Sequence, residues 1–174
     1  MVGTLNTKLI IIRGNSASGK TTAAWEIRRR FGRGIAIVSQ DVIRRDILRQ
    51  KDHPRNPAIG LMDLTARYAL DHGFHVVLEG ILFSQSHAEM LLKLVQDHAG
   101  ESACFYYDLT FDQTLVRHET KPQAAEYGAE MMHDWYNERD LIPGLNEKIF
   151  DADISLDSAV SAMMAAVHMQ PQEN

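Results

Sequence analysis

Residues 8–22 read KLIIIRGNSASGKTT, an apolar run followed by a glycine-framed loop that ends in a lysine and two threonines. A short run rich in isoleucine is typical of a parallel strand that is buried on both faces. The loop matches G-x-x-x-x-G-K-T, the Walker A pattern, whose backbone N–H groups and lysine bind phosphates. An apolar strand before the loop and a helical pattern after it are the context that this motif requires. The stretch therefore predicts a nucleotide-binding loop at the start of an α/β protein.

Each fixed position of the loop has a physical reason. The glycines let successive N–H groups curl inward, and a helix beginning at Lys20 adds its positive N-terminal end. Lys20 would place its ammonium on the terminal phosphates, and Thr21 would offer a hydroxyl oxygen to Mg²⁺. We therefore expect ATP and Mg²⁺ as cofactors. The predicted nucleotide-binding residues are Gly14, Asn15, Ser16, Ala17, Ser18, Gly19, Lys20, Thr21 and Thr22.

Further apolar runs follow the first, and helical segments separate them. The expected strands are residues 35–39, 75–79, 103–109 and 154–156, and residues 124–139 are expected to form a long helix. Strands that alternate with helices favour a parallel sheet, here of about five strands, with helices on both faces. The ligands of such sheets bind beyond the carboxyl ends of the strands. The sequence therefore predicts an α/β fold with its site at that edge.

Length and composition are those of one ordinary globular domain. The chain has 174 residues, of which 45% are hydrophobic and 24% are charged. No apolar run approaches the roughly 18 residues that a membrane helix needs, and the N-terminus lacks a signal-peptide pattern. The single cysteine, Cys104, excludes an internal disulfide. We expect one domain over residues 1–174, a cytoplasmic location, no membrane partner and a disordered tail at residues 170–174.

The net charge of −5 conceals an uneven distribution. Residues 1–58 hold twelve basic and four acidic side chains, whereas the remainder holds six basic and nineteen acidic ones. The acidic remainder disfavours a long nucleic-acid track, which usually needs a continuous basic groove. The basic segment contains the phosphate loop, so its charge favours compact phosphates.

An aspartate follows the second expected strand, where a substrate pocket would open. A kinase needs a carboxylate that orients the attacking hydroxyl and accepts its proton, and Asp41 is placed for this role. Arg44 lies one helical turn further on the same face and can hold a phosphate by two parallel hydrogen bonds. The alternative interpretation is that Asp41 only caps the following helix. Glu79, at the end of the third strand, would bind Mg²⁺, or it would contact the acceptor and serve as the base instead; the alternative is a helix-capping or surface glutamate.

The phosphate loop and the pair Asp41-x-x-Arg44 together resemble a group of small P-loop kinases of the AAA type. This group includes phage-type polynucleotide kinase, zeta toxins and chloramphenicol phosphotransferase, and the resemblance runs from about Lys8 to about Arg139. In the polynucleotide kinases, an aspartate after the second strand is the general base and an arginine follows three residues later. The resemblance implies a P-loop NTPase fold with an adenylate-kinase-like core, and ATP-dependent phosphorylation of a hydroxyl.

The resemblance also implies a lid after the fourth strand. In similar kinases this lid carries arginines that close over the transferring phosphoryl group. Arg117 and Lys121 lie in the corresponding region, so we expect the lid near residues 117–125. Lysine at position 121 departs from the usual arginine and supplies a point charge rather than a planar fork. Arg139 would stack on adenine or reach the phosphates, although the aromatic pair that precedes it, Trp135 and Tyr136, is more typical of core packing.

These observations predict an ATP-dependent phosphotransferase that moves the γ-phosphoryl group to a hydroxyl of a small molecule, such as a nucleoside, a sugar nucleotide or an antibiotic. Two alternatives stay open: a polynucleotide 5′-hydroxyl kinase, and a nucleotide-binding regulatory or toxin-like protein without efficient transfer. The acceptor and the oligomeric state are left open as well. The predicted catalytic residues are Lys20, Asp41, Arg44, Arg117 and Lys121, and the predicted metal ligands are Thr21 and Glu79.

Overall fold

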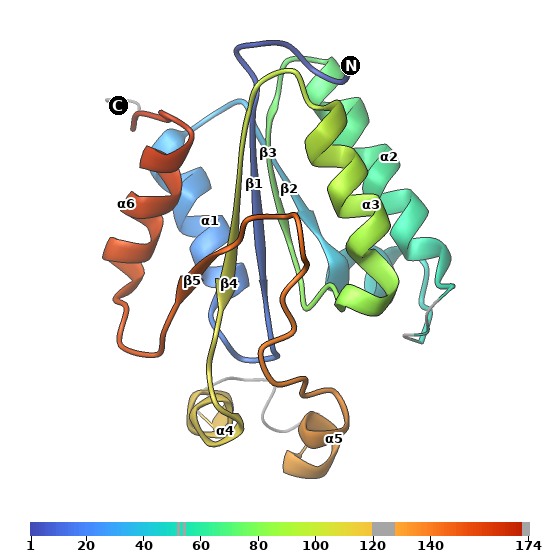
Figure 1. Ribbon diagram of the computed structural model, residues 1–174, viewed down its shortest axis with the longest axis vertical. Coiled ribbons are helices and arrows are strands. Elements are labelled where there is room, and N and C mark those ends of the chain that lie inside the picture. Colours follow the sequence, from blue (N-terminus) through green and yellow to red (C-terminus); the bar gives the residue numbers. More distant parts are fainter. Residues whose placement is uncertain (52, 54, 120–127, 172–174) are drawn as a thin grey trace.

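The computed structural model describes residues 1–51, 53, 55–119 and 128–171. Its centre is a five-stranded, all-parallel sheet with the strand order β2-β3-β1-β4-β5 (Figure 1). The expected α/β class and parallel sheet are therefore confirmed. The strands are β1 (Lys8–Gly14), β2 (Ile35–Ser39), β3 (His75–Glu79), β4 (Glu101–Tyr107) and β5 (Lys148–Phe150).

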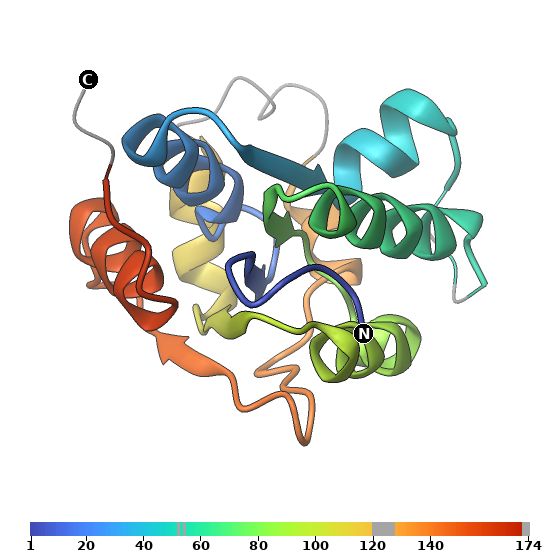
Figure 2. The same ribbon diagram turned by 90° about the horizontal axis from the view of Figure 1, so that it is seen from above.

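Helices cover both faces of the sheet. α1 and α6 lie on one face and α2 and α3 on the other, as Figures 1 and 2 both show. Two shorter helices, α4 and α5, lie beyond the carboxyl ends of the strands (Figure 1). The helices are α1 (Lys20–Phe31), α2 (Pro57–Asp71), α3 (Ser84–Asp97), α4 (Phe111–Glu119), α5 (Ala129–Asp134) and α6 (Leu156–Ala166), together with a π-helical turn, η1 (Val42–Ile47). Among the described residues, no helix is both long and apolar enough to cross a bilayer.

The apolar run of β1 lies at the centre of two hydrophobic cores. Leu9 and Ile11 belong to the core under α2 and α3, whereas Ile10 and Ile12 belong to the core under α1 and α6. All four side chains are fully buried, because successive strand residues point to opposite faces of a sheet that is covered on both sides. Burial of each contributes about 1.5–3 kcal/mol. Because both faces of the strand are buried, apolar and polar residues do not alternate along the run.

The predicted strand at residues 154–156 is wrong. The last strand is β5, which pairs with Phe105–Tyr107 of β4, and Phe150 stacks on Phe105 with ring centroids 5.2 Å apart. Ser155 instead caps α6, because its side chain accepts a hydrogen bond from the Ser158 N–H. A three-residue strand with one buried side chain has too little periodicity to be recognised in the sequence.

Two other boundaries differ from the prediction. β4 ends at Tyr107, so Leu109 lies beyond the strand. The helix predicted at residues 124–139 is much shorter within the described residues: α5 begins at Ala129 and ends at Asp134, and Trp135 forms its C-cap. Residues 120–127 lie outside the described part of the chain.

Candidate active site

The phosphate loop joins β1 to α1, and its glycines are required by the backbone. Gly14 has φ 142°, and a Cβ there would lie 2.8 Å from the carbonyl oxygen of Tyr107 on β4. Gly19 has φ 104° and forms the N-cap of α1. Ala17, between them, also has a positive φ of 61°. The loop thus has left-handed positions that glycine accommodates best.

Lys20 lies across the loop rather than pointing away from it. Its side chain is buried, and its Nζ donates to the Asn15 carbonyl oxygen at 2.7 Å and to Ser18 Oγ at 3.2 Å. The ammonium is therefore held at the phosphate loop by neutral oxygens. A phosphate that entered the loop would offer charged acceptors, which form stronger hydrogen bonds than these neutral ones.

Glu79 connects the ends of β2 and β3 to the phosphate loop. The strand register places Ser39 beside Glu79, and Ser39 Oγ donates to Glu79 Oε1 at 2.5 Å. Thr21 Oγ1 donates to the other carboxylate oxygen at 3.1 Å. Glu79 is only 2% exposed, so these hydroxyls compensate the burial of its charge. The three side chains bring hard oxygen atoms together at the loop.

These oxygens fit a magnesium ion that keeps water and phosphate ligands. Within the described residues, no group of three or more His, Cys, Asp or Glu side chains is arranged to hold a metal by itself. Mg²⁺ is commonly held by one or two carboxylates together with substrate phosphates, rather than by a cage of protein ligands. Thr21 and Glu79 match this donor set.

Asp41 opens toward solvent at the start of η1. Its side chain is 66% exposed, and its Oδ1 accepts from Arg44 Nη2 at 3.1 Å and from Arg45 Nε at 3.3 Å. Its side chain makes no capping hydrogen bond, so the capping alternative is wrong. The turn that follows is a π-helix, in which the Leu48 N–H donates to the Ile43 carbonyl oxygen at 3.0 Å. Single π-turns are frequent at functional sites.

One cleft of about 970 Å³ joins the phosphate loop to this second carboxylate. Lys20, Thr21 and Glu79 line it together with Asp41 and Arg44, so most of the predicted site residues are brought together. Additional lining residues that were not predicted as site residues include Val42, Arg45, Asp46, Lys51, Ile81, Phe83, Met131 and Trp135. The sequence indicated core packing for Trp135. It lines the cleft instead, because α5 ends at Asp134 and Trp135 is its C-cap. No local pattern marks the others.

Arg117 contacts the phosphate loop, although it is not among the residues that line the cleft. Its Nη1 donates to the Ser18 carbonyl oxygen at 2.9 Å, and its Nη2 donates to the Ala152 carbonyl oxygen at 2.7 Å. α4 therefore places this arginine against the loop, between the loop and the segment that follows β5. Lys121 and most of the predicted lid lie outside the described residues.

Asn15 ties the phosphate loop to the segment that follows α5. Its side chain is buried, its Nδ2 donates to the Asn137 carbonyl oxygen at 2.8 Å, and its Oδ1 accepts from the Asn137 N–H at 3.0 Å. The sequence predicted only a contact with nucleotide for this residue. Arg139, two residues after Asn137, is largely exposed and lies 3.5 Å from Asp108, so no contact with the cleft is seen for it.

A buried ion cluster holds the segment that follows α5 against the end of β1. Arg13 is fully buried, and its guanidinium donates to Asp140 Oδ2 at 3.0 Å and to Glu147 Oε1 at 2.7 Å. It also donates to the Leu82 carbonyl oxygen through Nε and Nη2. The Asp140 N–H donates to the hydroxyl of Tyr106, and burial raises the pKa of that hydroxyl to about 12. The sequence analysis did not predict this cluster, although an arginine at the end of a buried apolar run is a signal that could have indicated it.

Comparison with known proteins gives a family and several structures of the same fold. A family model described as an AAA domain, AAA_33, matches residues 9–134. The APS kinase CysC of Mycobacterium tuberculosis, solved with AMPPNP and APS, has a TM-score of 0.73 and 16% identity, with 94% of this chain and 98% of that chain covered. The Deinococcus radiodurans tunicamycin resistance protein has a TM-score of 0.67 and 18% identity, with 97% and 99% covered. No curated protein matches the sequence.

One further structure with a similar fold comes from an RNA repair complex. A chain of the Pnkp1/Rnl/Hen1 RNA repair complex has a TM-score of 0.56 and 15% identity, with 82% of this chain and 50% of that chain covered. At these identities the structural comparisons establish the fold. Together with the family match, they confirm the resemblance to small P-loop kinases that the Walker loop and Asp41-x-x-Arg44 indicated.

Proposed function

Since this chain belongs to the AAA_33 family of AAA domains, we propose that it is a kinase that moves the γ-phosphoryl group of ATP to a hydroxyl of a small molecule. The observation that carries this proposal is the single cleft in which Lys20, Thr21 and Glu79 face Asp41 and Arg44. Phosphate-binding groups at one end and a solvent-accessible carboxylate at the other suit transfer between a bound nucleotide and a second substrate.

The nucleotide would be held by residues 14–22. The N–H groups of the loop and the N-terminal end of α1 would bind the phosphate oxygens, and Lys20 would exchange its contacts with Asn15 and Ser18 for contacts with the terminal phosphates. Thr21 and Glu79 would hold Mg²⁺, which neutralises charge on the β- and γ-phosphates when it is bound. The Ser39 hydroxyl keeps the Glu79 carboxylate oriented toward the loop.

Asp41 is the better candidate for the general base. Both oxygens of Glu79 already accept hydrogen bonds from hydroxyl groups, and that carboxylate is buried. Asp41 is exposed at the open part of the cleft, where an acceptor could approach. As the acceptor oxygen bonds to the γ-phosphorus, the bond from that phosphorus to the bridging oxygen breaks, ADP leaves, and the hydroxyl proton passes to Asp41.

Two arginines complete the proposed site in different ways. Arg44 orients Asp41 through its hydrogen bond and would stabilise negative charge on the phosphoryl group. Arg117 rests on the Ser18 carbonyl oxygen, from which a rotation of its side chain would bring the guanidinium to the phosphates. Lys121 would join Arg117 in a lid near residues 117–125. With Lys20 on α1, Arg44 on η1 and Arg117 on α4, the charge stabilisation would come from side chains of three different elements.

The shape of the cleft supports a compact acceptor. Its lining includes the apolar side chains of Ile81, Phe83 and Trp135, and also the basic side chains of Arg45 and Lys51. A flat apolar group beside an anionic group suits these walls. The alternative is a polynucleotide 5′-hydroxyl kinase, which the similarity to a chain of an RNA repair complex favours. The excess of acidic side chains after residue 58 argues against a long nucleic-acid track.

The test is a transfer assay with γ-labelled ATP against a panel of hydroxyl compounds that includes nucleosides, sugar nucleotides and single-stranded oligonucleotides with a 5′-hydroxyl. Label should move to a small acceptor in the wild type and should not move in Lys20→Ala. Transfer to the oligonucleotide alone, with an affinity that falls steeply as salt rises, would replace the proposal with the polynucleotide alternative. ATP hydrolysis that no acceptor accelerates would instead favour a regulatory protein.

A substitution of Asp41 tests whether this residue is the general base. Asp41→Asn should bind ATP nearly as well as the wild type, while transfer falls by roughly 10²-fold or more, the scale of a lost general base. Glu89→Gln removes an exposed carboxylate on α3, which is not among the residues that line the cleft, and should retain transfer. If Asp41→Asn transfers at the wild-type rate, the base is a different group and Glu79 becomes the candidate.

A further inference from the structure

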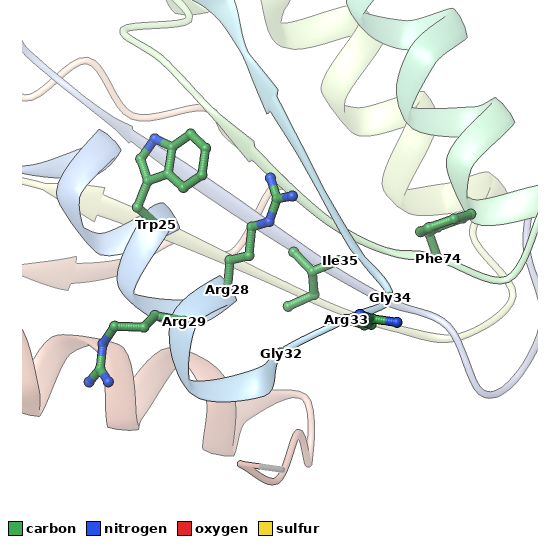
Figure 3. A pocket seen from close by; sticks show the side chains of 8 residues that line it. All are labelled: Trp25, Arg28, Arg29, Gly32, Arg33, Gly34, Ile35 and Phe74. Carbon is green, nitrogen blue, oxygen red and sulfur yellow. The ribbon is translucent and has the colours of Figure 1, made fainter. Parts of the chain in front are cut away.

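A second hollow lies at the opposite end of the sheet from the phosphate loop. It has a volume of about 630 Å³ and is formed by the end of α1, the start of β2 and the residue before β3 (Figure 3). Trp25 and Phe74 contribute aromatic surface, and their side chains are 55% and 45% exposed. Figure 3 shows these two rings on either side of β2. Exposed aromatic side chains that gather in one hollow commonly mark an interaction site.

The rim of this hollow is positively charged. Arg28 lies over the ring of Trp25 at 5.2 Å from its centroid, and Arg33 is exposed at the turn into β2. Arg29 is neutralised by Glu26, to which it donates from Nε and Nη2 at 2.7 Å. Within the described part of the chain, neither Arg28 nor Arg33 forms an ion pair with a carboxylate. Two cations are thus available to a partner.

The strand beside the hollow has a free edge. β2 is the first strand of the sheet and pairs only with β3 among the described strands. The Gly34 carbonyl oxygen accepts from the His75 N–H at 2.9 Å, so that residue faces β3. Because alternate residues of a strand direct their N–H and C=O groups to opposite sides, Ile35 and Ile37 direct theirs to the open edge. Such an edge can accept another extended chain.

We propose that β2 and this hollow dock an extended, acidic peptide segment of a partner protein. The main chain of the peptide would add a strand beside β2, an apolar side chain would enter the hollow beside Trp25, and its carboxylates would meet Arg28 and Arg33. Strand addition would satisfy the N–H and C=O groups of Ile35 and Ile37, for which no partner at the open edge is found within the described residues, whereas a nucleic acid would leave them unpaired. A second copy of β2 would bring two sets of these arginines together, so charge disfavours self-association.

The experiment measures fluorescence anisotropy of a labelled peptide of about eight residues, in which glutamate alternates with valine around a central phenylalanine. The peptide should bind the wild-type chain, and its affinity should fall as salt is added. The same peptide with lysine in place of glutamate should not bind. N-methylation of alternate peptide nitrogens should abolish binding in one of the two possible series and preserve it in the other, because only one series faces β2.

A charge-reversal variant tests the location. Arg28→Glu/Arg33→Glu should weaken peptide binding about tenfold or more, since repulsion replaces attraction at both positions. Lys93→Glu, which reverses one charge on α3, should bind as the wild type does, and an unchanged thermal unfolding midpoint shows that the double variant is folded. No binding up to about 1 mM peptide, equal binding by the double variant, or no effect of either N-methylated series overturns the proposal. Tighter binding of an oligothymidylate that the double variant loses would overturn it in favour of a nucleic-acid surface.

Discussion

Replacement of the buried arginine at the end of β1 should destabilise the protein strongly. Arg13→Leu removes the only cation that contacts Asp140 and Glu147 among the described ion pairs, and the two carboxylates are 17% and 2% exposed. Removal of one partner of a buried ion pair typically costs about 3–5 kcal/mol, because it leaves an uncompensated charge. Asp140 keeps hydrogen bonds from the Ser84 N–H and hydroxyl, which favours the lower end of that range. We therefore expect a loss of about 3 kcal/mol.

Urea unfolding at neutral pH measures this loss as a lower midpoint at an unchanged slope. For a chain of this size the same loss lowers the thermal midpoint by about 6–12 °C. The variant Arg13→Leu/Asp140→Asn/Glu147→Gln removes the two unpaired charges as well, so it should recover part of the stability. A single variant that loses less than about 1 kcal/mol would refute the reasoning, and so would a triple variant that is less stable than the single one.

Three further changes test individual contacts. Asn15→Ala breaks both hydrogen bonds to Asn137 and should weaken nucleotide binding about tenfold in a titration, whereas unchanged affinity would show that the loop does not need this support. Glu79→Gln should raise the Mg²⁺ concentration for half-maximal transfer by about 10–100-fold, and an unchanged requirement would remove Glu79 from the metal site. Burial, and secondarily the charge of Lys8, lowers the pKa of His98 below 6.5. The folded state then binds fewer protons than the unfolded state, so the free energy of unfolding should fall as the pH drops below about 6.5. Between neutral pH and about pH 5.5, urea unfolding should show a smaller fall in this free energy for His98→Gln than for the wild type. An equal loss in both would contradict this assignment.

Local sequence patterns predicted most of the fold, and the errors in that prediction have local causes. The continuous apolar run before Gly14 predicted a strand buried on both faces, and this strand is the central one of the sheet. β5 was missed because only Phe150 of its three residues is buried. The strand expected at residues 154–156 was wrong because its apolar residues flank Ser155, which caps α6.

The features of the candidate site also fall into those that the sequence predicted and those that only the structure shows. The Walker pattern located the loop, and the strand-end rule located Asp41 and Glu79, because carboxyl ends of parallel strands meet at one edge. The hydrogen bonds that join Ser39 and Thr21 to Glu79 depend on register between elements far apart in the chain. Trp135 entered the cleft because the helix before it ends early, and no motif signals such an ending.

The sequence alone determined the phosphate loop, the parallel α/β order and the carboxylates at the strand ends, since these follow from short-range periodicity and from the backbone demands of glycine. Tertiary structure alone decided which groups meet. Asn15 contacts Asn137, Arg13 contacts Asp140 and Glu147, and Arg28 and Arg33 border a hollow beside an open strand edge. Contacts of this kind join residues that are far apart in the chain, so packing of the complete fold selects them.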